Sequence, residues 1–325
     1  MDVLAGLDIG GTKCAASLGA MSGEDVTLLD KRRFPTPPTP GAALAQLGDT
    51  LEALLNEHPH ASLQAVGISC GGPLDSRLGL ILSPPNLPAW DRIDVVRPFR
   101  DRFGVPVALE NDANACALAE WRWGAGRGCR NVVFLTFGTG MGAGLILDGR
   151  LYAGTNEMAG EVGHVRLAED GPVGYGKAGS FEGFCSGGGI EQLARQMALE
   201  VLQQGGRPGY CPTVDDLATV TAERVGQAAQ RGDALALAVY GVVARRLGQG
   251  LAVLVDVLNP ERIVIGSIYA RQQALLEPLM LETLRREALP RALAVCQVAP
   301  AGLGERVGDM ASLSVAAGAL EGGTR

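Results

Sequence analysis

Hydrophobic residues recur along this chain in two alternating patterns. Short apolar runs of the kind found in buried strands cover residues 3–9, 13–18, 65–69, 105–109, 132–137, 143–147 and 262–266. Longer segments with helical periodicity cover residues 42–57, 113 to about 123, 189–204, 214–231, 234–258, 274–288 and 310–320. Strands that alternate with helices in this way predict an α/β fold.

Proline and glycine mark the loops between these elements. The segments 34–41 and 82–90 are too rich in proline for a helix or a central strand, and residues 149–186 are dense in loop-forming residues. We expect polar side chains to gather in this middle segment, because glycines there leave the backbone free to turn.

Two glycine-rich turns share one design. LDIGGTK (7–13) and FGTGMGAG (137–144) each place a glycine turn between two apolar strands. Such a turn lets backbone N–H groups approach phosphate oxygens, which a side chain would prevent. The repeat predicts two related lobes with a boundary near residue 120, and a phosphate-bearing ligand. Neither turn is a P-loop, since GxxxxGK[ST] is absent from the sequence.

Composition excludes several classes of protein. The chain has 325 residues, 47% of them hydrophobic, and a net charge of −7, which disfavours nucleic acid or an anionic membrane as partner. The start of the chain lacks the basic segment of a signal peptide, and the longest uncharged run, 131–147, is too short to span a membrane. Seven scattered cysteines without a CxxC pair indicate reduced thiols. We therefore expect a soluble cytoplasmic protein.

Two aspartates are candidates for chemistry. Asp8 precedes the first glycine turn, where a carboxylate can hold Mg²⁺ through water or can simply cap the turn. The second turn favours the metal-binding interpretation. Asp112 follows a buried strand and precedes a helix, where it can accept a proton from a substrate hydroxyl or serve as the helix N-cap. Both roles of Asp112 are compatible.

Polar residues of the middle segment suit a ligand with several hydroxyls. Glu161, His164 and Glu182 supply directional donors and acceptors there, although a single histidine is more often structural. Asn86 and Trp90 of the second proline-rich loop can close over such a polyol, and anchoring of the loop is an equally good interpretation of Trp90.

The motifs together resemble the ROK sugar kinases and repressors, within the actin-like sugar-kinase superfamily. The resemblance covers nearly the whole chain and rests on LDIGGTK (7–13), GGP (71–73), PNLPAW (85–90), ENDANACALAE (110–120), FGTGMGAGLILDG (137–149), GEVGH (160–164), E-x-x-x-S-G (182–187) and VIGS (264–267). It implies an actin-like, ribonuclease-H-like fold of two α/β domains around a central cleft. The small domain would hold residues 1–120 and a returning C-terminal helix, about 309–322, and the large domain residues 121–308.

The resemblance also assigns roles to residues. Asp112 would be the general base. The sugar would be held by Gly71, Gly72, Asn86, Asn111, Asp112, Glu161, His164 and Glu182. The nucleotide would be bound by Asp8, Gly10, Gly11, Thr12, Lys13, Gly138, Thr139, Gly140, Gly187 and Gly266, with Mg²⁺ at Asp8 through water.

One departure from the family pattern concerns zinc. Many members carry three cysteines that bind structural zinc together with the GH histidine. The corresponding positions here are Val173, Tyr175 and Ser180, none of which is a good zinc ligand. We therefore predict no structural zinc, which leaves His164 to the sugar.

The function implied is ATP-dependent phosphorylation of a hexose hydroxyl, usually the one on C6, with glucose as leading substrate and a homodimeric state. N-acetylglucosamine, N-acetylmannosamine, fructose and allose are alternatives of the same class. A sugar-responsive repressor is disfavoured, because only seven residues precede Asp8 and we find no basic recognition helix. A non-catalytic sugar sensor is the remaining alternative, which Asp8 and Asp112 argue against.

Overall fold

The chain folds into two compact units. In the computed structural model, which describes residues 1–322, unit 1 contains Met1–Phe134, Gly144–Gly160 and the residues from Ala301 onward. Unit 2 contains Leu135–Ala143 and Glu161–Pro300. The chain first leaves unit 1 within strand β9 (Val132–Leu135), whereas the sequence places the boundary near residue 120.

A five-stranded mixed sheet forms the centre of unit 1. Its order is β3-β2-β1-β4-β8, with β1 Asp2–Ile9, β2 Lys13–Ser22, β3 Asp25–Pro35, β4 Ser62–Cys70 and β8 Val107–Asn111. The first three strands are antiparallel, while β4 runs parallel to both β1 and β8. The carboxyl ends of β1, β4 and β8 therefore meet at one edge of the sheet.

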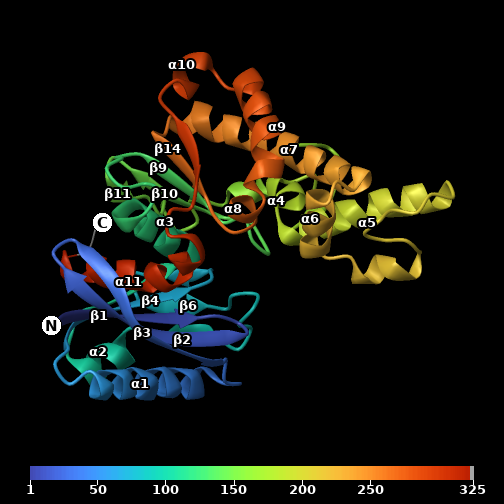
Figure 1. Ribbon diagram of the computed structural model, residues 1–325. Coiled ribbons are helices and arrows are strands. Elements are labelled where there is room, and N and C mark those ends of the chain that lie inside the picture. Colours follow the sequence, from blue (N-terminus) through green and yellow to red (C-terminus); the bar gives the residue numbers. More distant parts are fainter. Residues whose placement is uncertain (323–325) are drawn as a thin grey trace. The chain divides into compact units, whose positions relative to one another are not determined.

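Helices cover both faces of this sheet (Figure 1). Alternate residues of β1, such as Leu7 and Ile9, share a core with helices α1 (Pro40–Glu57) and α2 (Arg97–Phe103). Leu4 points to the opposite face, where it packs with α3 (Asp112–Trp123) and α11 (Val307–Leu320). Because strand side chains alternate, Asp8 belongs to this second face.

The remaining elements of unit 1 are short. Strands β5 (Leu74–Asp75), β6 (Leu80–Leu82) and β7 (Asp91–Asp94) form an antiparallel sheet, β10 (Ala143–Leu147) pairs with β11 (Arg150–Leu151), and η3 covers Gly304–Arg306.

Unit 2 is largely helical. Its elements are η1 Val162–His164, β12 Val173–Gly174, β13 Lys177–Ala178, α4 Phe181–Phe184, α5 Gly187–Gln203, η2 Asp215–Thr219, α6 Ala222–Gln230, α7 Ala234–Leu258, β14 Arg262–Ile265, α8 Ile268–Arg271, α9 Gln273–Glu287, α10 Pro290–Leu293 and β15 Gln297–Pro300. Within the described residues, α7 alone is long and apolar enough to cross a membrane, yet 61% of its apolar window is buried inside the protein. That burial, against α9, α5 and α6, is typical of a core helix.

Several elements differ from the sequence interpretation. Strands β3 and β15 and helix α2 are not predicted, and the segment 214–231, expected as one helix, divides into η2 and α6. Thr221 explains the division, since its side chain accepts a hydrogen bond from the Arg224 N–H and starts a new helix. Strand β3 lacks the apolar run that predicts a buried strand, because a strand at the edge of a sheet buries few of its side chains.

Gly67 tests the packing of α11 on the sheet. A Cβ atom at Gly67 would lie 2.1 Å from the Ser312 carbonyl oxygen, so Gly67→Ala must push helix and strand apart. We expect a loss of about 1–3 kcal/mol in the free energy of unfolding, as in other overpacked cores. The measurement is urea denaturation followed by circular dichroism.

Gly41→Ala is the control for this prediction. Gly41 lies in the first turn of α1, and nothing would lie within 4 Å of its Cβ. Alanine should leave stability unchanged or raise it slightly. Equal effects of the two substitutions would contradict the close approach.

Candidate functional site

The first glycine turn is closed by its own backbone. The Gly10 N–H donates to the Lys13 carbonyl oxygen at 3.1 Å, and the Thr36 hydroxyl donates to the Gly10 carbonyl oxygen at 2.5 Å. Gly11 needs to be glycine for a packing reason, since a Cβ there would lie 2.5 Å from the Asn86 carbonyl oxygen. The predicted residues Gly10, Gly11 and Asn86 thus lie together.

Asp112 is the first residue of α3, and Asn111 caps that helix. The Asn111 Oδ1 accepts from the Ala113 N–H at 2.9 Å, and Asp112 Oδ1 accepts from the same N–H at 2.8 Å. The hypothesis that Asp112 is the N-cap is therefore wrong by one residue, because the extended backbone of Asn111 already turns its amide onto the helix. Asp112 Oδ2 is not part of this capping bond.

The Gly71–Gly72 turn lies beside the start of α3. A Cβ on Gly71 would lie 3.9 Å from Asp112 Oδ2, and one on Gly72 would lie 3.1 Å from Asn111 Nδ2. These four predicted residues form one cluster within unit 1.

Desolvation raises the pKa of both aspartates, and the charge of Asp112 adds to the rise at Asp8. Although part of each residue reaches solvent, the surrounding protein removes hydration from the Asp8 carboxyl and, with the nearby charge of Asp112, raises the pKa of Asp8 to about 6. The positive charges of Lys31 and Arg33 oppose that rise. Desolvation also raises the pKa of Asp112, against the opposing effect of the Ala113 N–H. The carboxylates of Asp8 and Asp112 can bind a hard cation or accept a proton.

The second glycine turn belongs to unit 2. The Gly138 N–H donates to the Gly140 carbonyl oxygen at 3.1 Å, and the Gly187 N–H donates to the Gly138 carbonyl oxygen at 2.7 Å. Gly266 is buried after β14, and its N–H bonds the Leu135 carbonyl oxygen at 3.0 Å. The predicted nucleotide residues of unit 2 therefore share one backbone framework, with Thr139 exposed at the tip of the turn.

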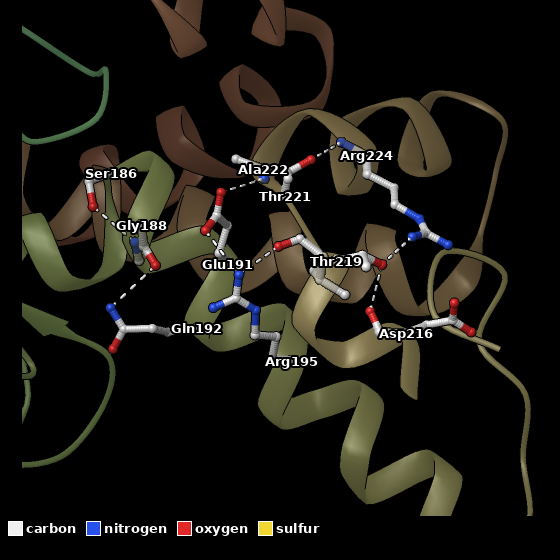
Figure 2. A network of polar contacts seen from close by, with 12 residues as sticks. Ser186, Gly188, Glu191, Gln192, Arg195, Asp216, Thr219, Thr221, Ala222 and Arg224 are labelled. Carbon is white, nitrogen blue, oxygen red and sulfur yellow. Dashed lines mark hydrogen bonds and ion pairs between the residues drawn. The ribbon is translucent and has the colours of Figure 1, made fainter. Parts of the chain in front are cut away.

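A polar network holds the start of α5 in place (Figure 2). The Ser186 hydroxyl accepts from the Gly189 N–H at 3.0 Å and so caps the helix. One turn later, Glu191 accepts from the Ala222 N–H at 3.4 Å, and Arg195 donates to the Val220 carbonyl oxygen at 2.8 Å. These contacts tie α5, and with it Gly187, to Val220 and to the first residue of α6.

Glu182 reaches the second glycine turn. Its Oε2 accepts from the Met141 N–H at 2.9 Å, and a Cβ on Gly140 would lie 2.9 Å from that oxygen. Glu161 and His164 stand at the two ends of η1 with exposed side chains, and the His164 carbonyl oxygen accepts from Lys177 Nζ at 2.7 Å. Polar groups thus gather in the middle segment within unit 2.

The three positions compared with zinc ligands have other tasks. Val173 lies in β12, Tyr175 is 78% exposed in the turn before β13, and Ser180 caps α4 by accepting from the Gly183 N–H. The lack of structural zinc stays a prediction.

Trp90 does not reach a ligand-binding surface. It is 2% exposed and belongs to the core beneath α1, so its role is to anchor the proline-rich loop. A cavity of about 570 Å³ in unit 1 lies between Leu4, Trp121 and Glu321, at the other end of β1 from Asp8, and contains none of the predicted residues. We therefore do not place the site there.

Sequence reasoning missed the basic residues near Asp8. In the sheet, Ala15 of β2 pairs with Asp8 of β1 on one side and with Arg33 of β3 on the other. Arg33 therefore lies level with Asp8, two strands away. Lys31 and Arg33 form ion pairs with Asp309 at the start of α11. The signal was the KRR run at 31–33, which becomes informative only once β3 is known.

Comparisons with known proteins agree with these motifs. A family model described as "ROK family" matches residues 4–317. A glucokinase of Halalkalibacterium halodurans is 33% identical over 310 residues, 93% of this chain and 91% of that protein. A solved structure of a ROK hexokinase from Thermus thermophilus is 31% identical, covers 99% of this chain and 100% of its own, and superposes with a TM-score of 0.79. A ROK family glucokinase from Streptomyces griseus, in complex with glucose and AMPPNP, is 30% identical with a TM-score of 0.73, covering 97% and 99%.

The coupling of the two aspartates can be measured. Asp112→Asn removes a negative charge that raises the pKa of Asp8, so that pKa should fall below about 6 while remaining above its ordinary value of 3.8, because desolvation persists. Lys31→Met removes a positive charge and should move the pKa of Asp8 upward. Carboxyl ¹³C NMR titration of Asp8 measures both shifts. Shifts of the same sign would contradict this electrostatic account.

Proposed function

This chain belongs to the ROK family, and from that membership we propose that it is an ATP-dependent hexose kinase of the glucokinase type. The observation that carries the proposal is Asp112, a carboxyl with a raised pKa at the start of α3, beside the Gly71–Gly72 turn. It has the position and the chemistry of a general base for a hydroxyl.

The reaction would proceed by in-line transfer. The oxygen of a sugar hydroxyl, which we assign to C6, bonds to the γ-phosphorus while the bond from that phosphorus to the β,γ-bridging oxygen breaks. Asp112 accepts the hydroxyl proton, and the products are a sugar phosphate and ADP. Raised basicity suits this role, since a carboxylate with a higher pKa holds the transferred proton better.

Mg²⁺ fits the residues around Asp8. Desolvation, together with the charge of Asp112, raises the pKa of Asp8 although Lys31 and Arg33 oppose the rise, and carboxylate oxygens are the donors that Mg²⁺ prefers. When bound with ATP, Mg²⁺ neutralises charge on the phosphates. We assign Asp8 to this ion through water, as the sequence predicts.

The other roles follow the sequence predictions and are proposals. The phosphates are assigned to the backbones of Gly10, Gly11, Thr12, Lys13, Gly138, Thr139 and Gly140, and the adenosine to Gly187 and Gly266. The sugar is assigned to Gly71, Gly72, Asn86, Asn111, Glu161, His164 and Glu182. Closed turns such as Gly10–Lys13 support this assignment, because the bond that closes the turn fixes its backbone before a phosphate binds.

We also infer a cytoplasmic homodimer. All seven cysteines are free, which suits a reducing compartment.

Glucose is the preferred substrate because the similar enzymes of Halalkalibacterium halodurans and Streptomyces griseus are named glucokinases. Amino sugars and other hexoses are tested in the same assay.

Asp112→Asn tests the proposal. With wild type, we expect ADP release that depends on a hexose, measured by a coupled assay across a panel of hexoses and N-acetylhexosamines. Asparagine keeps the shape of the side chain but cannot take the proton, so kcat should fall about 10²–10⁴-fold with a small change in KM.

Asp148→Asn is the matched control, because Asp148 is an exposed aspartate paired with Arg130 on the surface. Its kcat should equal that of wild type. Sugar binding without turnover by wild type would overturn the kinase proposal in favour of a sensor. An active Asp112→Asn enzyme would remove Asp112 from the mechanism.

A further inference from the structure

Ser76 and Glu157 form a latch between two loops of unit 1. The Ser76 N–H donates to Glu157 Oε2 at 2.7 Å, and the Ser76 hydroxyl donates to Glu157 Oε1 at 2.8 Å. The two residues are 81 positions apart, and both are only partly exposed. One carboxylate thus receives two charge-assisted hydrogen bonds from a single residue, which is a strong and directional contact.

The loop that carries Glu157 has left-handed backbone at three positions. Gly154, Glu157 and Gly160 all have left-handed backbone, with φ of 80°, 65° and 92°. Glycine adopts that conformation freely, whereas glutamate does so only under constraint. Inside the loop, the Ala159 N–H bonds the Ala153 carbonyl oxygen at 3.1 Å. A long-range bond to the carboxylate of a strained residue indicates that this side chain holds the loop in place.

Each end of the latch lies close in sequence to proposed sugar-binding residues. Ser76 follows Gly72 by four residues, with only Pro73 and strand β5 between them. Glu157 precedes Glu161 by four residues. A shift of either loop would therefore move groups assigned to the sugar, while the glycine turn at Gly10–Lys13 has its own closing bonds.

We propose that the Ser76–Glu157 latch is a positioning element for the sugar, which fixes the loop 154–160 relative to the segment after the Gly71–Gly72 turn. The proposal rests on the hexose kinase function. Ser76 and Glu157 act through the segments that they hold and take no part in proton or phosphoryl transfer.

The kinetic test separates strain from contact. Glu157→Gly removes the carboxylate but suits the left-handed backbone, so it loses the latch without adding strain. We expect its KM for glucose to rise about tenfold, with kcat and the KM for ATP within about twofold of wild type. Ser76→Ala should give a smaller rise because its N–H remains. Glu157→Gln, which keeps one acceptor oxygen, should lie between wild type and Glu157→Gly.

Thr213→Ala is the matched control. Thr213 donates its N–H and its hydroxyl to Asp216 Oδ2 at 3.0 and 2.6 Å, which is the same kind of contact in unit 2. Its loss should leave the KM for glucose unchanged. The double variant Ser76→Ala/Glu157→Gly should match Glu157→Gly alone, since both residues belong to one contact.

A second measurement does not depend on activity. Hydrogen exchange of amides in 154–160, followed by mass spectrometry, should be faster in Glu157→Gly than in wild type, with exchange in α1 unchanged. If wild type turns over no hexose while exchange in this loop accelerates, the kinase proposal fails and the latch stands. A KM for glucose within twofold of wild type in an active Glu157→Gly enzyme would overturn the positioning role, and so would unchanged exchange.

Discussion

Two carboxylates at one edge of a sheet are the constraint on which unit 1 is built. Strands β1, β4 and β8 run parallel, so Asp8 near the end of β1 and Asp112 just after β8 both lie at their carboxyl edge. Desolvation by the surrounding protein raises the pKa of Asp8, and the negative charge of Asp112 raises it further. A fold that only needed stability would gain by replacing one of them. Keeping both makes sense where a cation and a proton are to be handled.

The rest of unit 1 makes this edge possible. The N-terminus of α3 offers the Ala113 N–H to Asp112, which stabilises the ionised form. On β3, Lys31 and Arg33 bring positive charge toward Asp8 while Asp309 holds them. The basic residues thus moderate the repulsion without neutralising it.

The predictability of each element follows from how local its cause is. Helix α1 and strands β1 and β4 can be predicted from apolar periodicity, because the residues that form their buried faces are close together in the sequence. Strand β3 is polar because it is an edge, and the helix expected over 214–231 breaks at Thr221 because a side-chain cap competes with continuation. Such breaks depend on single hydrogen bonds that periodicity does not record.

The same distinction divides the candidate site. Asp8 and Asp112 were predictable because Asp8 lies near the end of a strand, just before a glycine turn, and Asp112 directly follows one, and the edge they share follows from parallel order. Thr36 and the Ser76–Glu157 latch were not, since each joins segments tens of residues apart and shows no local pattern. The only feature that singles out Glu157 within its own loop is the left-handed backbone, with φ of 65°. That conformation indicates a constraint from outside the loop. Chemistry that depends on where a strand ends can therefore be predicted from sequence, whereas the contacts that hold a loop in register with its neighbour need the folded chain.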